Sequence, residues 1–240
     1  MHYTPRTIAF HTDLVHPPAP VDPGPIQRVH NRLFASSEPL YRNFHVTPKG
    51  PVLANQGESP GRASQVAFLA DRVRFVEEGT GLTIEEFAGR VTRIIGLVGE
   101  ERPYPLFAAQ QVTIRTLVNP RNYPGGLEFL RDGLLGARSP GEEFGREPGA
   151  LGLRLAFGMQ PDRPQAFAVR IESLPADPRS LLLENQGTFG PIAPAGGPAT
   201  QAGQGLEPLE QNILTTYSFA TNELLRFLAR FETSNDEDSA

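Results

Sequence analysis

The C-terminal run from residue 206 to about residue 232 restricts the fold more than any other segment of this sequence. Its apolar residues recur at three- and four-residue steps, which predicts one amphipathic helix. They are Leu206, Leu209, Ile213, Tyr217, Ala220, Leu224, Phe227, Leu228 and Phe231. At about 1.5 Å per residue, this helix would be roughly 40 Å long. The apolar stripe is wider than a coiled-coil seam, so we expect a helix that lies across a sheet.

The N-terminal half predicts strands interleaved with two helices. Residues 7–12 and 106–118 alternate apolar and polar side chains, as strands with one buried face do. Asp22 before Pro23 predicts the start of a short helix, and Thr83 with Glu86 forms the capping box of a longer one. The segments near 41–53 and 66–75 look extended, and a change of phase at residues 71–72 indicates a bulge or a break.

The C-terminal half predicts three short strands before the long helix. Residues 151–159, 167–171 and 181–183 alternate and are separated by turn-forming residues, which favours an antiparallel meander. Residues 119–149 are rich in loop-forming residues and contain one short helical pattern at 127–135. We expect poor order in the connector 191–205, and disorder in the acidic tail 233–240.

These patterns predict an α+β fold made of two antiparallel sheet units, with helices packed on one face and a long C-terminal helix. Residues 1–118 would form a β-α-β-β-α-β unit, 119–149 a loop-rich seam, and 150–232 the meander with its helix. One continuous domain over 1–232 is left open. The alternative is a single curved sheet that grips the C-terminal helix, as in START-like proteins, with an apolar cavity between helix and sheet.

Composition excludes several classes of protein. The 240 residues include no cysteine, which removes thiol chemistry and disulfides and fits a reducing compartment, so we expect a cytoplasmic protein. The formal charge of −5 argues against a dedicated nucleic-acid surface. No segment is long and apolar enough to predict a membrane span.

No motif in the sequence indicates catalysis or a cofactor. Nucleophile-elbow, phosphate-loop, dinucleotide and zinc-protease motifs are all missing. His11, Asp13 and His16 are metal-ligand types, but a strand followed by prolines would point the two histidines in unrelated directions, so we predict no metal site. The sequence therefore favours a non-enzymatic protein. A catalytic pair of carboxylates stays open, because no spacing rule reveals one.

Two near-identical pentapeptides, at 53–57 and 183–187, suggest an internal duplication. About 0.5 four-of-five matches are expected by chance in a chain of this length, so the echo alone does not establish one. Each segment places a glycine where a strand is expected to end. Asn185, Gln186 and Gly187 would then form a hinge before the connector, and we expect a ligand or partner contact there.

Charged residues of the predicted strands alternate out of phase with the apolar ones. Arg115, Arg154, Arg170, Glu172 and Glu184 should therefore share sheet faces turned away from the core, as a solvated charge ladder or as a partner-binding surface. From this pattern we predict partner contacts at Arg115, Asn119, Arg121 and Asn122.

The run Thr113-Ile114-Arg115-Thr116-Leu117-Val118-Asn119-Pro120-Arg121, and the strand Val169-Arg170-Ile171-Glu172, resemble two motifs of a sporadically distributed family of uncharacterised bacterial proteins. The order of predicted elements over residues 7–232 is similar as well. Two features depart from the family: the spacing from arginine to asparagine is one residue longer, and Glu172 stands where aspartate is usual. The resemblance implies a fold and a bacterial origin, but no activity.

Two functions follow from these expectations. The first is a non-enzymatic protein-interaction or assembly module, with a homodimer among its forms, that uses its arginine-rich faces to meet an acidic partner. The alternative is a carrier of a small apolar ligand in a pocket under the C-terminal helix. Phe219, Phe227 and Phe231 would count against that pocket if they filled the space beneath the helix.

Overall fold

A computed structural model describes residues 3–35, 40–55, 61–102, 104, 106–136, 144–193 and 205–232. The first half contains β1 (Arg6–Val15), α1 (Pro23–Phe34), β2 (Asn43–Thr47), β3 (Gly50–Asn55), β4 (Ala63–Phe68), β5 (Arg72–Glu78) and α2 (Ile84–Glu101). The second half contains β6 (Ala109–Val118), α3 (Gly126–Glu128), η1 (Phe129–Leu134), β7 (Gly152–Phe157), β8 (Ala166–Leu174), β9 (Asp177–Phe189), α5 (Glu207–Ser218), η2 (Phe219–Leu224) and α6 (Leu225–Ala229). Most of the predicted connector, at 194–204, and the predicted tail, at 233–240, lie outside the described residues.

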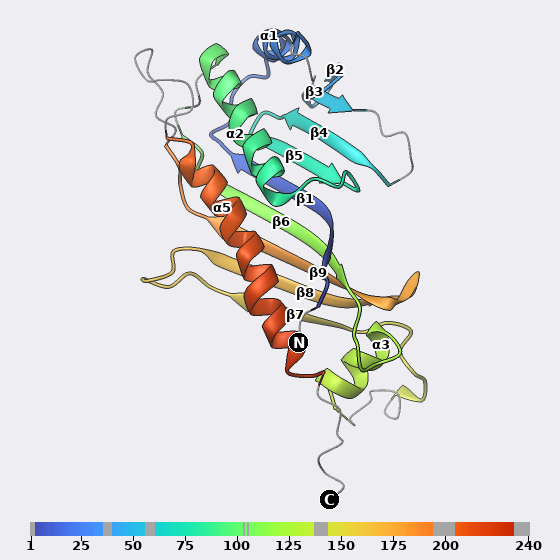
Figure 1. Cartoon of the computed structure of the whole chain (residues 1–240). Helices are drawn as coiled ribbons and strands as arrows, with labels where there is room; N and C mark the ends of the chain where they lie inside the picture. Colours follow the sequence, from blue (N-terminus) through green and yellow to red (C-terminus); the bar gives the residue numbers. More distant parts are fainter. Residues whose placement is uncertain are drawn as a thin grey trace, which may run out of the picture.

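The described strands form one curved antiparallel sheet in the order β2-β3-β4-β5-β1-β6-β9-β8-β7. Figure 1 shows α2 and α5 side by side across one face of this sheet, with α1 beyond α2. The long C-terminal helix crosses the sheet as the sequence predicts. The predicted α+β class, with helices on one face, is therefore confirmed.

The two halves repeat one arrangement about the centre of the sheet. Each begins with an inner strand, β1 or β6, continues through a helical segment and hairpin strands, and ends in a helix on the same face. The two inner strands pair with each other, Phe10 opposite Ile114, so the predicted sheet units join edge to edge. The pentapeptide echo does not reflect this repetition, because Leu53 lies on β3 and Leu183 on β9, which occupy unequal places.

The change of phase at residues 71–72 marks a turn between two strands. Leu69 donates its backbone N–H to the carbonyl of Arg72 at 2.8 Å, and β4 and β5 pair antiparallel on either side. The turn lets Val66 and Val73 both face the core. The first half therefore has a strand hairpin where the sequence predicted one extended segment with a bulge or a break.

The capping box predicted for α2 is present. The Thr83 hydroxyl accepts from the backbone N–H of Glu86 at 3.2 Å, and the Glu86 carboxylate accepts from the backbone N–H of Thr83 at 2.7 Å. Further along the helix, Arg90 donates to the buried Glu77 carboxylate of β5 at 2.5 Å. Burial raises the pKa of Glu77, although Arg90 opposes that change. Cap and ion pair together fix α2 on the first half of the sheet.

The terminal helix contains a π-helical segment, η2, that the sequence analysis did not predict. Along the whole terminal helix, the buried residues of α5, η2 and α6 are Leu209, Ile213, Thr216, Ala220, Leu224 and Leu228. From Thr216 to Leu228 these residues are four apart at each step. In an α-helix of 3.6 residues per turn, side chains at that spacing drift away from one side of the helix. The wider π turn absorbs the excess residue. Buried residues therefore stay on the side of the helix that faces the sheet, both before and after η2.

The space directly beneath this helix is filled. Phe219 stacks on Phe167 of β8, and Phe227 and Phe231 pack on the buried side chains of the second half. This set, which we call the second core, consists of Val118, Phe129, Leu130, Val169, Ile171, Leu181, Leu183, Leu224 and Leu228. Helix and sheet thus meet through packed side chains along this stretch.

Candidate functional site

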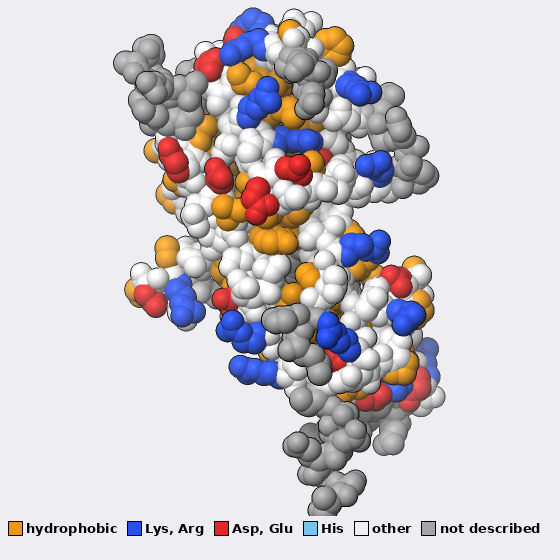
Figure 2. Space-filling view, in the orientation of Figure 1, with side chains coloured by type: hydrophobic (Ala, Val, Ile, Leu, Met, Phe, Trp, Pro, Cys, Tyr) orange, Lys and Arg blue, Asp and Glu red, His pale blue; other side chains and the backbone are white. Residues whose placement is uncertain are grey.

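A cleft of about 730 Å³ lies beside the terminal helix, on the helix-covered side of the sheet. One wall is the connection between β7 and β8, residues 158–165, and the other is formed by α5 and η2. Figure 2 shows this connection standing out from the body of the molecule at the left, where basic and acidic side chains are interspersed. The volume falls within the range typical of small-molecule sites.

Three phenylalanine rings form the apolar part of the cleft. Phe167 and Phe219 stack with centroids 4.1 Å apart, and Phe157 meets Phe219 edge to face at 5.6 Å. Phe157 is 45% exposed, because it lies at the end of the edge strand β7. The exposed Phe157 and the half-buried Phe219 therefore offer an apolar surface to a ligand, supported from below by the buried Phe167.

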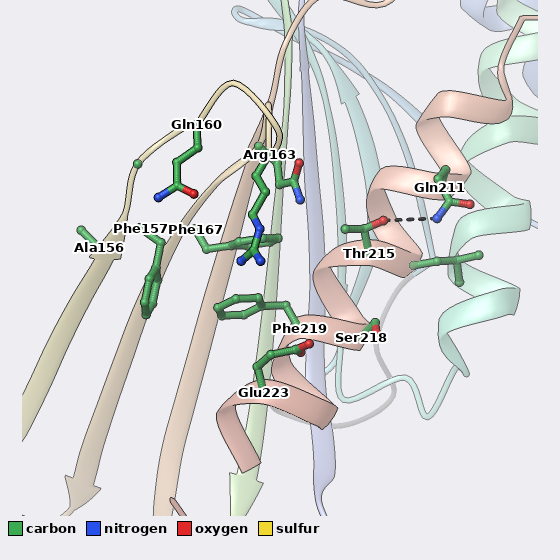
Figure 3. Close-up of a pocket in the computed structure, with 13 residues that line it drawn as sticks. Ala156, Phe157, Gln160, Arg163, Phe167, Gln211, Thr215, Ser218, Phe219 and Glu223 are labelled. Carbon is green, nitrogen blue, oxygen red and sulfur yellow. Dashed lines mark hydrogen bonds between the residues drawn. The ribbon is translucent and has the colours of Figure 1, made fainter. Parts of the chain in front are cut away.

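A tight turn places the cationic side chain of Arg163 in the same cleft. Gln160 and Arg163 exchange backbone hydrogen bonds of 2.9 and 3.0 Å, which close the turn through Pro161 and Asp162. In Figure 3 the Arg163 side chain reaches from the turn into the cleft. Its ion pair with Asp162 is long, at 3.9 Å, and both side chains are about three-quarters exposed. The guanidinium is therefore available to an anionic group.

The helical wall is polar. Gln211, Thr215 and Ser218 line the cleft from α5, and Gln211 donates to the Thr215 hydroxyl at 3.2 Å (Figure 3). Glu223 of η2 lines the far end. Ser218, Phe219 and Glu223 share this side because the π turn shifts the downstream residues around the helix axis.

Arg115 lies on the face of the sheet opposite the helices, which we call the open face. It donates to Glu184 of β9 at 2.6 Å and lies 3.6 Å from Glu78 of β5. Further pairs extend this row into a charge ladder, whose members are His11, Glu78, Arg115, Glu184, Arg170 and Glu172. The predicted ladder of cross-strand charges is therefore present.

The three residues predicted as a ligand or partner contact, 185–187, lie on different faces of the sheet. Asn185 and Gly187 are buried beneath α5, and Asn185 donates its side-chain amide to the carbonyl of Thr216 at 2.8 Å. Gln186 lies on the open face. The predicted hinge is wrong, because β9 continues to Phe189. Gly187 permits close approach of the helix, since a Cβ there would overlap the Thr216 hydroxyl.

The predicted contacts at 119–122 gather around a buried carboxylate. Glu232 accepts from the backbone N–H groups of Arg121 and Asn122, and from the Tyr3 hydroxyl at 2.6 Å. Burial, and then Glu232, raise the pKa of Tyr3. The Asn119 side chain accepts from Ser180 nearby at 2.9 Å. The loop thus ties the C-terminal end of the helix to the N-terminal segment.

Sequence reasoning missed the residues of the cleft. Phe157 was assigned to a strand and Phe219 and Glu223 to the terminal helix, and nothing in their spacing indicated that they meet. Two signals were present: a turn sequence, Pro161-Asp162, directly before Arg163, and the run of four-residue steps that produces η2.

The described residues contain no group of three or more histidine or acidic side chains that could hold a metal ion. His11 lies on the open face against Glu78, whereas His16 follows the end of β1 and is buried against Tyr104. None of the helices in the described ranges has the length and apolar character required to cross a membrane.

Comparison with family models and with curated proteins found no match to this sequence. The resemblance to a bacterial family drawn from residues 113–121 and 169–172 therefore stays a prediction.

Proposed function

We propose that this protein is a non-enzymatic binding protein that holds a small amphipathic anion in the cleft beside the terminal helix. The observation that carries the proposal is the combination of a three-ring apolar surface with Arg163 in the same cleft. A ligand with an apolar ring or chain would rest on Phe157 and Phe219. Its carboxylate, sulfonate or phosphate would pair with Arg163.

Amide side chains on both walls of the cleft support binding of an extended ligand. Gln160, Gln165 and Gln211 present amide groups that can donate or accept, so a ligand with polar groups along its length finds partners in the cleft. The carrier hypothesis drawn from the sequence placed an apolar pocket under the terminal helix. The proposed site differs in two ways: the cleft lies beside the helix, and its lining is amphipathic.

The lining favours holding a ligand over transforming it. Glu223 is the one carboxylate among the described lining residues, and no histidine or second acid accompanies it. General acid–base catalysis needs groups placed to give and take protons at a reacting atom. A single exposed carboxylate beside rings and amides supports recognition instead.

The test uses the fluorescent probe 8-anilinonaphthalene-1-sulfonate, which combines aromatic rings with an anion. We expect saturable binding, with affinity reduced about fivefold or more by Phe157→Ala and by Arg163→Glu. The matched controls are Phe34→Ala and Arg179→Glu. Phe34 is exposed on α1, and Arg179 is exposed at the start of β9, at the end of the sheet away from the cleft. Equal affinities in all four variants would reject the proposal.

Location and origin belong to the same proposal. The absence of cysteine supports a cytoplasmic protein, and the motifs around Arg115 and Glu172 support a bacterial source. The charge of −5 supports a partner other than nucleic acid.

A further inference from the structure

Strand β7 leaves one side of its backbone unpaired within the described part of the chain. It forms an edge of the sheet and pairs with β8 alone. Ser173 donates its backbone N–H to the carbonyl of Leu151, opposite it, at 3.0 Å. Because such pairs alternate along an antiparallel ladder, the backbone groups of Gly152, Arg154 and Ala156 point outward. These residues are exposed and offer donors and acceptors to another strand.

The charge ladder on the open face ends at this edge with two like charges. Along one row Glu78, Arg115, Glu184 and Arg170 alternate in sign from β5 to β8. Arg154 of β7 then lies directly opposite Arg170. Like charges in directly opposed positions destabilise a sheet. An acidic side chain beyond Arg154 would give this arginine an opposite charge on its outer side.

The other face of β7 is apolar. Leu153 and Leu155 are half-buried against the second core, and Phe157 is 45% exposed. A strand added here would therefore have acidic residues on the open face and apolar residues on the helix-covered face. This alternation defines the sequence that the edge would accept.

We propose that β7 binds an extended segment of a protein partner in which acidic and apolar residues alternate, and that this segment extends the sheet. A second copy of β7 fits less well, because residues 152–157 contain Arg154 and no acid. It would bring another cation to a row that already ends in two. The inference goes beyond ligand binding in the cleft, since Arg154 lies on the opposite face.

The test measures the fluorescence anisotropy of a labelled peptide of alternating valine and glutamate, added to the full chain. We expect saturable binding that is lost when alternate backbone amides of the peptide are N-methylated, because these can no longer donate to β7. Arg154→Glu should weaken binding of this peptide about fivefold and improve binding of its valine–lysine counterpart. Arg179→Glu, an exposed arginine of β9, should change neither.

A second variant, Ala156→Pro, removes an outward N–H from the edge, where proline is tolerated. It should abolish binding while the circular dichroism spectrum stays that of the wild type; if it fails to fold, Arg154→Glu alone decides. Equal affinity of the N-methylated peptide, or identical behaviour of Arg154→Glu and Arg179→Glu, would overturn the proposal. So would a dimer in sedimentation that Ala156→Pro dissociates, because the occupant would then be a second copy.

Discussion

The side-chain amide of Asn185 donates to the main-chain carbonyl of Thr216 at 2.8 Å, one turn before the terminal helix becomes π-helical at Phe219. Gly187, two residues along the same strand, lets the helix approach closely enough for this bond. The helix therefore lies at a fixed height and rotation over β9. That position determines which of its side chains reach the cleft.

Gly187→Ala tests the close approach of strand and helix. A Cβ there would overlap the Thr216 hydroxyl and lie 2.8 Å from the Phe189 ring. We expect the free energy of unfolding in urea to fall by about 1–3 kcal/mol, as for other overpacked core sites. Gly149→Ala, where a Cβ meets no atom within 4 Å, is the control and should change stability far less.

Tyr3→Phe tests the attachment of the helix end. The variant removes one of the hydrogen bonds to the Glu232 carboxylate, which is 2% exposed. Loss of a bond to a buried charged group costs about 1–3 kcal/mol. Hydrogen exchange should accelerate in α6. Tyr123→Phe, whose hydroxyl makes no hydrogen bond seen in the described ranges, should leave that exchange unchanged.

The pKa of His11 gives the stability of the sheet a pH dependence. Partial burial lowers this pKa below its usual 6.5, with Arg115 acting in the same direction and Glu78 against it. The unfolded chain therefore binds the proton more tightly than the folded protein does. The contribution of His11 to the free energy of unfolding is present above pH 6.5 and is lost as pH falls through the pKa of the folded protein.

The measurement is urea unfolding of wild type and His11→Gln between about pH 5 and pH 7, across the ordinary titration range of histidine. The wild type should lose more stability than the variant as pH falls. A stability difference between the two proteins that stays constant across this range would contradict the assignment.

Arg115→Met tests the charge ladder. The change leaves Glu184 and Glu78 without their shared cation on the open face. At low ionic strength we expect a loss of about 0.5–2 kcal/mol, because one variant removes two cross-strand pairs. In about 1 M NaCl the loss should shrink, since screening acts over roughly 3 Å. Arg179→Met should show no comparable salt dependence.

Elements whose residues are neighbours in the chain could be read from sequence. The capping box at Thr83 and Glu86 predicted the start of α2, and the alternation at residues 106–118 predicted β6, which begins at Ala109. The turn at Asp71 was read as a bulge or a break, because a reversal and a bulge shift the apolar phase in the same way. Local pattern could not distinguish the two.

The cleft could not be predicted because its parts come from distant segments. Phe157 and Phe219 meet through the pairing of β7 with β8 and the rotation of the terminal helix. Asn185 and Gly187 looked like a strand end, since asparagine and glycine favour turns. Burial under α5 outweighed that local preference, and β9 continued beneath the helix.

The sequence by itself determined the class of fold, the long helix and the alternation of charges along each strand, because these follow from periodicity and local capping. Only the tertiary structure decided how the two halves join. The pairing of β1 with β6 places Glu78, Arg115 and Glu184 in one row, and the registry of neighbouring strands fixes each ion pair. Registry depends on contacts between segments far apart in the chain, which no local pattern specifies.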